Sequence, residues 1–214
     1  CQAYPEGVRA VVHPHVARVL AHNNDDWYVT FLKKFGERFP ITEKGSLELY
    51  LGTHIEWAED RESVTLTQER DADVMLERFN MTDCKPANTP MELGFDTSAV
   101  PKDNVSPNFP YLAAIGCLLW RCANVSVEMY NAVNTLARFS GNFTNYHVEA
   151  IKRCYRYVKA TKHRGLRFRR DPTVKMQDGK FPIFMKMYCD SDWAGCKATR
   201  RSTGDMYSNY LEIC

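Results

Sequence analysis

A proline-rich stretch at residues 83–110 limits most strongly how this chain can fold. It holds five of the ten prolines in the 214-residue sequence. Proline fixes φ and removes a backbone donor, so helices and central strands do not run through such a segment. We therefore predict a linker at 83–110 with a structural unit on each side. Apolar residues make up 44% of the chain and charged residues 25%, which is typical of globular proteins.

Before the linker, the sequence predicts strands followed by a helix, and then a β-hairpin followed by a second helix. The corresponding ranges are 8–21, 25–37, 47–67 and 69–80. Asn24 or Asp25 can cap the first helix, in which Trp27, Phe31 and Phe35 recur every four residues. In the hairpin, apolar and polar residues alternate from Leu49 onward, which indicates one long strand with two different faces.

After the linker, apolar spacing predicts three helices, at 110–123, 127–140 and 145–161. Strand candidates follow at "GLRFRR" and "FPIFMKMYC". The order of elements indicates an α+β fold. The eight cysteines form neither a CxxC pair nor a zinc-finger spacing, so we expect reduced structural thiols.

The densest charge in the chain lies between residues 152 and 170. Nine Lys or Arg residues occur there without a single Asp or Glu. Helical spacing places Lys152, Arg156 and Lys159 on one face, with Tyr155 and Tyr157 interleaved. Such a face is suited to a phosphate backbone, although an ordinary solvated helix face has the same pattern. The candidate nucleic-acid-binding residues are Lys152, Arg153, Arg156, Lys159, Lys162 and Arg164.

Two features suggest metal chemistry. Asp190 and Asp192 follow an apolar strand candidate, and an aspartate at a strand end is well placed to hold a divalent cation. His13 and His15 are two residues apart on another strand candidate. No third ligand accompanies the histidines, and that pattern is typical of surface histidines. We therefore predict no metal site in this chain.

Four segments together resemble the reverse transcriptase and ribonuclease H region of Ty1/copia-type retrotransposon Pol polyproteins. The strings are "LKKFGERFPITEKGSLELYLGTHIEW", "VTLTQERDADVMLERFNMTDCKPANTPM", "PYLAAIGCLLWRCANVSVEMYNAVNTLARFSGNFTNYHVEAIKRCYRYVKATKHRGLRF" and "YCDSDWAGCKATRRST". The resemblance implies a layout: the end of a polymerase palm with a primer-grip-like hairpin at 1–82, then the linker at 83–110. Residues 111–170 would be a helical thumb and connection, and 181–214 the first strands of an RNase H-like domain.

The resemblance also implies which catalytic groups are missing. Polymerisation in this class uses two magnesium ions held by carboxylates, two of them from a Y-x-D-D turn. That turn falls on residues 14–17, where Val16 and Ala17 replace both aspartates. Asp190 matches the first of four RNase H carboxylates, and the chain ends at Cys214 before the next. One carboxylate is insufficient for a metal pair.

The sequence thus predicts a degenerate, catalytically inactive Pol fragment with residual binding to an RNA–DNA hybrid or DNA. The alternative is a protein-interaction or regulatory module, possibly secreted, derived from the same remnant. No membrane segment and no signal peptide are visible, so the expected location is intracellular, cytoplasmic or nuclear. Salt-dependent binding to a hybrid duplex would separate the two hypotheses.

Overall fold

The computed structural model describes residues 8–13, 16–21, 25–39, 42–46, 48–60, 62–95, 108–169, 184–191 and 204–211, with the single residues Thr173, Trp193 and Ser202. It divides the chain into two compact units. The first comprises residues 1–67, 167–170 and 214, and the second comprises 68–166 and 171–213. The described elements mix helices with antiparallel strands, in agreement with the predicted α+β class.

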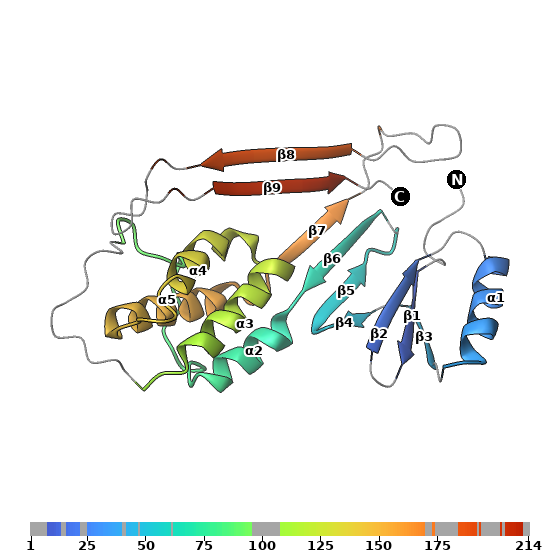
Figure 1. Cartoon of the computed structure of the whole chain (residues 1–214), viewed down its shortest axis with the longest axis horizontal. Helices are drawn as coiled ribbons and strands as arrows, with labels where there is room; N and C mark the ends of the chain where they lie inside the picture. Colours follow the sequence, from blue (N-terminus) through green and yellow to red (C-terminus); the bar gives the residue numbers. More distant parts are fainter. Residues whose placement is uncertain are drawn as a thin grey trace. The chain divides into compact units, whose positions relative to one another are not determined.

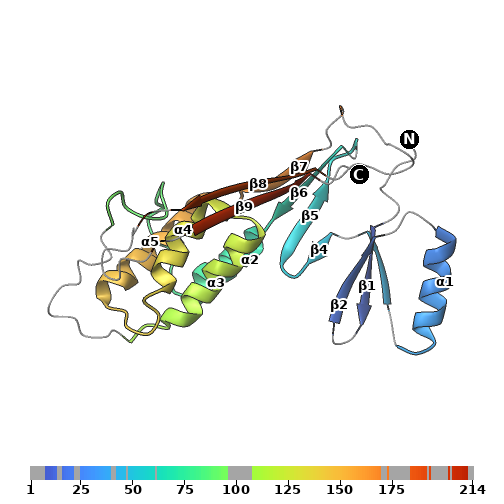
Figure 2. The ribbon, with the colours of Figure 1, turned by 45° about the horizontal axis from the view of Figure 1, so that its top comes forward.

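A three-stranded antiparallel sheet and one helix open the first unit (Figures 1 and 2). Strands β1 (Val8–His13) and β2 (Val16–Ala21) form a hairpin, and β3 (Thr42–Ser46) pairs with the other edge of β1. Helix α1 (Asp25–Gly36) confirms the predicted helix. Phe31 and Phe35 stack at a centroid distance of 5.3 Å, so their spacing of four places both rings on one face.

The second sheet has the order β4-β5-β6-β7. Its strands are β4 (Leu49–Tyr50), β5 (Thr53–Trp57), β6 (Ser63–Thr67) and β7 (Gly165–Arg169). The predicted single strand from Leu49 onward is wrong, because Leu51 and Gly52 turn the chain between β4 and β5. Both have positive φ, at 49° and 79°, as a two-residue type I′ hairpin turn requires.

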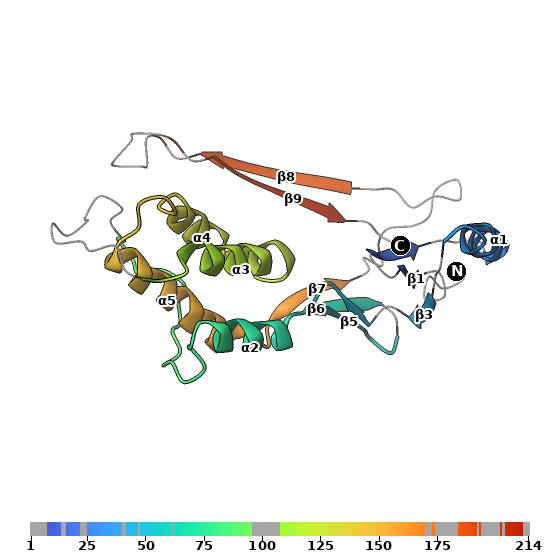
Figure 3. The same ribbon diagram turned by 60° about the horizontal axis from the view of Figure 1, so that its bottom comes forward.

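Four α-helices form the core of the second unit (Figure 3). They are α2 (Glu69–Arg78), α3 (Tyr111–Asn124), α4 (Tyr130–Ala137) and α5 (Asn145–Thr161), with the short 3-10 helix η2 (Val127–Met129) before α4. The predicted helices agree with these bounds, except that the middle one begins as η2. Each helix contributes an apolar face, and burying each large side chain stabilises the fold by about 1.5–3 kcal/mol.

Tyrosines occupy the centre of this core. Tyr111 and Tyr155 are almost completely buried, and their hydroxyls donate to the carbonyls of Leu136 (2.8 Å) and Ala114 (3.0 Å). Tyr157 is buried as well. The idea that Tyr155 and Tyr157 join the basic face is therefore wrong: both rings point into the core, where a nucleic acid has no access.

The segment Thr82–Phe95, named here the strap, packs along α5. The amide of Ala87 donates to the carbonyl of Arg156 (3.1 Å), and the thiol of Cys154 donates to the carbonyl of Pro90 (3.3 Å). The sequence predicted a linker at 83–110 between two units. The structure packs residues 83–95 of this predicted linker against α5, residues 96–107 lie outside the described residues, and the second compact unit begins at Gln68.

Strands β8 (Phe184–Ser191) and β9 (Gly204–Leu211) form an antiparallel hairpin. The strand predicted at 181–189 is confirmed from Phe184 onward. No helix in the described part of the chain is long and apolar enough to cross a membrane. The five cysteines that the structure describes are free, as expected, and burial raises the pKa of the Cys122 and Cys154 thiols to about 12.

Candidate nucleic-acid interface

Helix α5 carries most of the predicted site, and its first turn is fixed by a capping box. Thr144 is the N-cap, and its backbone amide donates to Nδ1 of His147 at 3.1 Å. The imidazole also stacks on Phe139 at 4.2 Å. Burial lowers the pKa of His147, which favours the neutral ring that can accept at Nδ1. A capping box satisfies helix N-terminal donors that have no partner within the helix, so α5 begins at a defined residue.

The structure brings Arg153, Arg156 and Lys159 together along the outer side of α5, where each contacts the strap. Lys159 Nζ donates to the carbonyls of Thr82 (2.6 Å) and Cys84 (2.8 Å). Arg156 Nε donates to the carbonyl of Lys85 at 2.6 Å. These donors hold an otherwise irregular segment in place by satisfying its carbonyls.

Arg153 uses both ends of its guanidinium on the strap. Nη1 forms an ion pair with Glu92 Oε1 at 2.9 Å, and Nη2 donates to Thr89 Oγ1 at 2.9 Å. The Glu92 side chain is 71% exposed, so solvent screens this pair and its contribution is small. The bond is therefore one that a competing anion can replace.

The remaining predicted cations also lie beside carboxylates or polar groups. Lys152 pairs with Glu149 at 2.7 Å. Lys162 pairs with Asp73 at 2.9 Å and with Glu69 at 3.7 Å, and its hydrogen bond to Asp73 raises its pKa. Burial raises the pKa of the Tyr157 hydroxyl, and an interaction with the exposed Arg164 opposes that shift.

The folded chain thus supplies carboxylates that the basic run lacks. Three of the six candidate cations, Lys152, Arg153 and Lys162, form ion pairs with four acidic side chains outside the run: Glu69, Asp73, Glu92 and Glu149. No spacing within 152–170 signals these partners, because three of them come from α2 and the strap. The positive field of this face is correspondingly weaker than the run alone indicates.

The candidate catalytic positions lie in strands. Val16 and Ala17 begin β2 and stand opposite His13 and Val12 of β1, while residues 14, 15 and 192 lie outside the described residues. Asp190 is in β8, directly opposite Asp205 of β9, a second aspartate that the sequence analysis did not single out. Within the described part of the chain, no three His, Cys, Asp or Glu residues gather as a possible metal site.

Comparison with known proteins gives several relatives. A retrovirus-related Pol polyprotein from transposon TNT 1-94 of Nicotiana tabacum is 29% identical over 203 residues, 91% of this chain and 14% of that protein. The chain is homologous to the Pol polyproteins of copia-type transposons. No family model matches the chain, and no solved structure matches it significantly.

Two shorter relatives match parts of this Pol homologue. The uncharacterized mitochondrial protein AtMg00810 of Arabidopsis thaliana is 30% identical over 165 residues, 77% of this chain and 63% of that protein. The secreted RxLR effector protein 161 of Plasmopara viticola is 35% identical over 104 residues, 49% of this chain and 64% of that protein. In all three relatives the match spans less than two thirds of the relative's own length.

Proposed function

We propose that this Pol-derived chain is an intracellular protein that binds nucleic acid through the outer face of α5 and has lost polymerase activity. The observation that carries the proposal is the fixed arrangement of Arg153, Arg156 and Lys159 against the strap. Strap carbonyls hold Arg156 and Lys159, and the side chains of Glu92 and Thr89 hold Arg153, in one geometry before any ligand arrives. Such preorganisation lowers the entropy cost of binding a phosphate backbone.

Free donors remain on this face. A guanidinium has five N–H donors. Among the described residues, Arg156 uses only the Nε donor, on the carbonyl of Lys85, so its Nη donors are available to a ligand. Lys152 has one carboxylate partner and a side chain that is 41% exposed. With four carboxylates nearby, we expect two or three phosphate contacts instead of six. The log–log salt slope for a duplex should then be about −2 to −3, at about −0.9 per contact.

The test is binding to a fluorescently labelled RNA–DNA hybrid over a range of NaCl concentrations. Lys152→Gln combined with Arg164→Gln removes two charges and leaves every strap contact in place. We expect weaker binding and a slope flattened by up to about two units. Arg138→Gln, at an exposed position after α4, removes the same kind of charge elsewhere and should change neither. Absence of binding by the wild type at low salt would overturn the proposal.

A further inference from the structure

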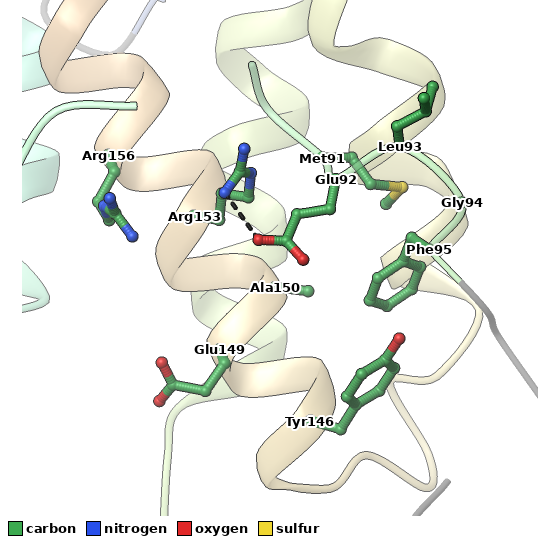
Figure 4. Close-up of a pocket in the computed structure, with 10 residues that line it drawn as sticks. All are labelled: Met91, Glu92, Leu93, Gly94, Phe95, Tyr146, Glu149, Ala150, Arg153 and Arg156. Carbon is green, nitrogen blue, oxygen red and sulfur yellow. Dashed lines mark hydrogen bonds and ion pairs between the residues drawn. The ribbon is translucent and has the colours of Figure 1, made fainter. Parts of the chain in front are cut away.

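A pocket lies between α5 and the strap (Figure 4). Its volume is about 270 Å³. Pockets for small ligands typically measure about 300–1,000 Å³. A space just below this range accommodates a flat ring the size of one base and excludes a duplex.

The pocket combines an aromatic surface with a guanidinium. Phe95 of the strap and Tyr146 of α5 stack at 4.9 Å with an interplanar angle of 9°. In Figure 4 this aromatic pair lies to one side of Ala150 and Arg156 to the other. The ion pair between Arg153 and Glu92 lines the space between them. Ala150 has a small side chain, so it leaves room for a flat ligand over the helix.

The spacing along α5 suits a ligand with a flat ring at one end and an anion at the other. Tyr146 and Arg156 are ten residues apart, which is about 15 Å along a helix at 1.5 Å per residue. The hydroxyl of Tyr146 and both Nη groups of Arg156 have no hydrogen-bond partner among the described residues. The two pocket carboxylates, on Glu92 and Glu149, are already paired with Arg153 and Lys152. Arg156 therefore supplies the uncompensated charge of the pocket.

We propose that this pocket binds a single strand, with one unpaired base extending the Phe95–Tyr146 stack and the phosphate of a nucleotide further along the strand at Arg156. Aromatic stacking accepts any base because every base has a π-face, and arginine supplies the charge for the backbone. The inference rests on the proposed nucleic-acid binding and adds to it a pocket that shares Arg153 and Arg156 with that face. An acidic peptide would satisfy Arg156 but would leave the aromatic pair unused.

The experiment measures binding of a labelled single-stranded DNA hexamer and of an abasic hexamer with the same phosphates. Tyr146→Leu should weaken binding of the normal hexamer by about 5- to 150-fold and leave the abasic hexamer unaffected. Tyr146→Phe keeps the ring and should bind like the wild type. Ala150→Leu, which fills the pocket without changing its charge, should behave like Tyr146→Leu. The control is Tyr130→Leu, an exposed tyrosine of α4 outside the pocket lining.

The outcomes separate this site from the general proposal. If Tyr146→Leu weakens both hexamers equally, or neither, the stacking site is overturned while duplex binding through Lys152 and Arg164 can still stand. If a poly-glutamate peptide displaces the hexamer as efficiently as unlabelled DNA of equal charge, the pocket recognises charge alone and the inference is wrong. Thermal unfolding of each variant establishes that the strap is still packed, and Phe95→Leu, which removes the other ring, should reproduce the Tyr146→Leu effect.

Discussion

At the scale of single residues, Arg121 shows how far a side chain's role can depart from its sequence setting. In the run "LLWRCA" it looks like an outward charge on an apolar helix, yet it is fully buried. Nη1 donates to the carbonyl of Gln68 at 3.0 Å, and Nη2 lies 3.5 and 3.4 Å from the carbonyls of Thr161 and Lys162. Arg121 thus joins the start of α2 to the end of α5.

The electrostatics of Arg121 explain why this position tolerates a buried charge. Burial lowers its pKa, while the charges of Glu128 and Asp71 act in the opposite direction. The carbonyls at the end of α5 carry the negative end of the helix dipole, where a cation is stabilising. Nothing in the local pattern indicates these partners, since they lie about 40 to 53 residues away in sequence.

Arg121→Met should therefore destabilise the protein. Methionine fills a similar volume but leaves the carbonyls of Gln68, Thr161 and Lys162 without this donor, and an unsatisfied buried group costs about 1–3 kcal/mol. Relief of charge burial offsets part of this, so we expect a net loss of about 2–4 kcal/mol in urea unfolding. Arg138→Met, at an exposed site, should stay within about 0.5 kcal/mol of the wild type. Unchanged or greater stability for Arg121→Met would show that the three contacts are dispensable.

At the scale of elements, sequence periodicity predicted the helices well and the strap poorly. Helix α5 was predicted with its observed bounds because buried positions such as Val148, Ile151 and Val158 recur at helical spacing. The strap has no periodicity, since its contacts are irregular carbonyls that meet cations of α5. A proline-rich segment shows where helices and strands end, but it does not show whether the segment itself packs against the rest of the protein.

The candidate site, too, could be predicted from the sequence only in part. The face of Lys152, Arg156 and Lys159 could be predicted from spacing alone; in the structure Arg156 and Lys159 both contact the strap, whereas Lys152 pairs with Glu149. The carboxylates that pair with cations of this region could not be predicted, because Glu92 and Asp73 come close to α5 only after the strap and α2 have packed. A run of basic residues in the sequence therefore gives the local charge only. The electrostatic field at the surface also depends on the acidic residues that the fold brings close to that run.

The strap gives a prediction at this scale. In a double-mutant cycle, Glu92→Gln and Arg153→Gln should show a small coupling in stability, about 0–1 kcal/mol, because the pair is exposed. Glu92→Gln should however strengthen hybrid-duplex binding at low salt and steepen the salt slope by up to about one unit. It frees Nη1 of Arg153 for a phosphate, while Thr89 still holds Nη2 in place. Glu77→Gln, an exposed charge on α2 without a described ion pair, is the matched control. Equal affinity for the Glu92 and Glu77 variants would show that Arg153 contacts no phosphate.

At the scale of the whole molecule, homology and geometry answer different questions. The Pol relatives match 85–92% of this chain, so the resemblance seen in four sequence segments is confirmed as ancestry. Ancestry does not specify retained chemistry, because that depends on particular side chains. The β1–β2 hairpin shows the difference, since its antiparallel pairing is intact while the expected metal ligands are aliphatic.

We accordingly expect no DNA synthesis by this protein on a primed RNA template, with magnesium or manganese. Two metal ions about 3.5–4 Å apart must be held by carboxylates for nucleotide transfer, and the side chains of Val16 and Ala17 have no carboxylate. Asp25 and Asp26 do not replace them, because they begin α1, a different element beyond the end of β2 at Ala21. Primer extension with labelled nucleotide should match a heat-denatured control, while hybrid binding by the same preparation shows that the protein is folded. Metal-dependent incorporation above that control would mean that polymerase activity is retained and that Val16 and Ala17 do not stand at the metal-ligand positions.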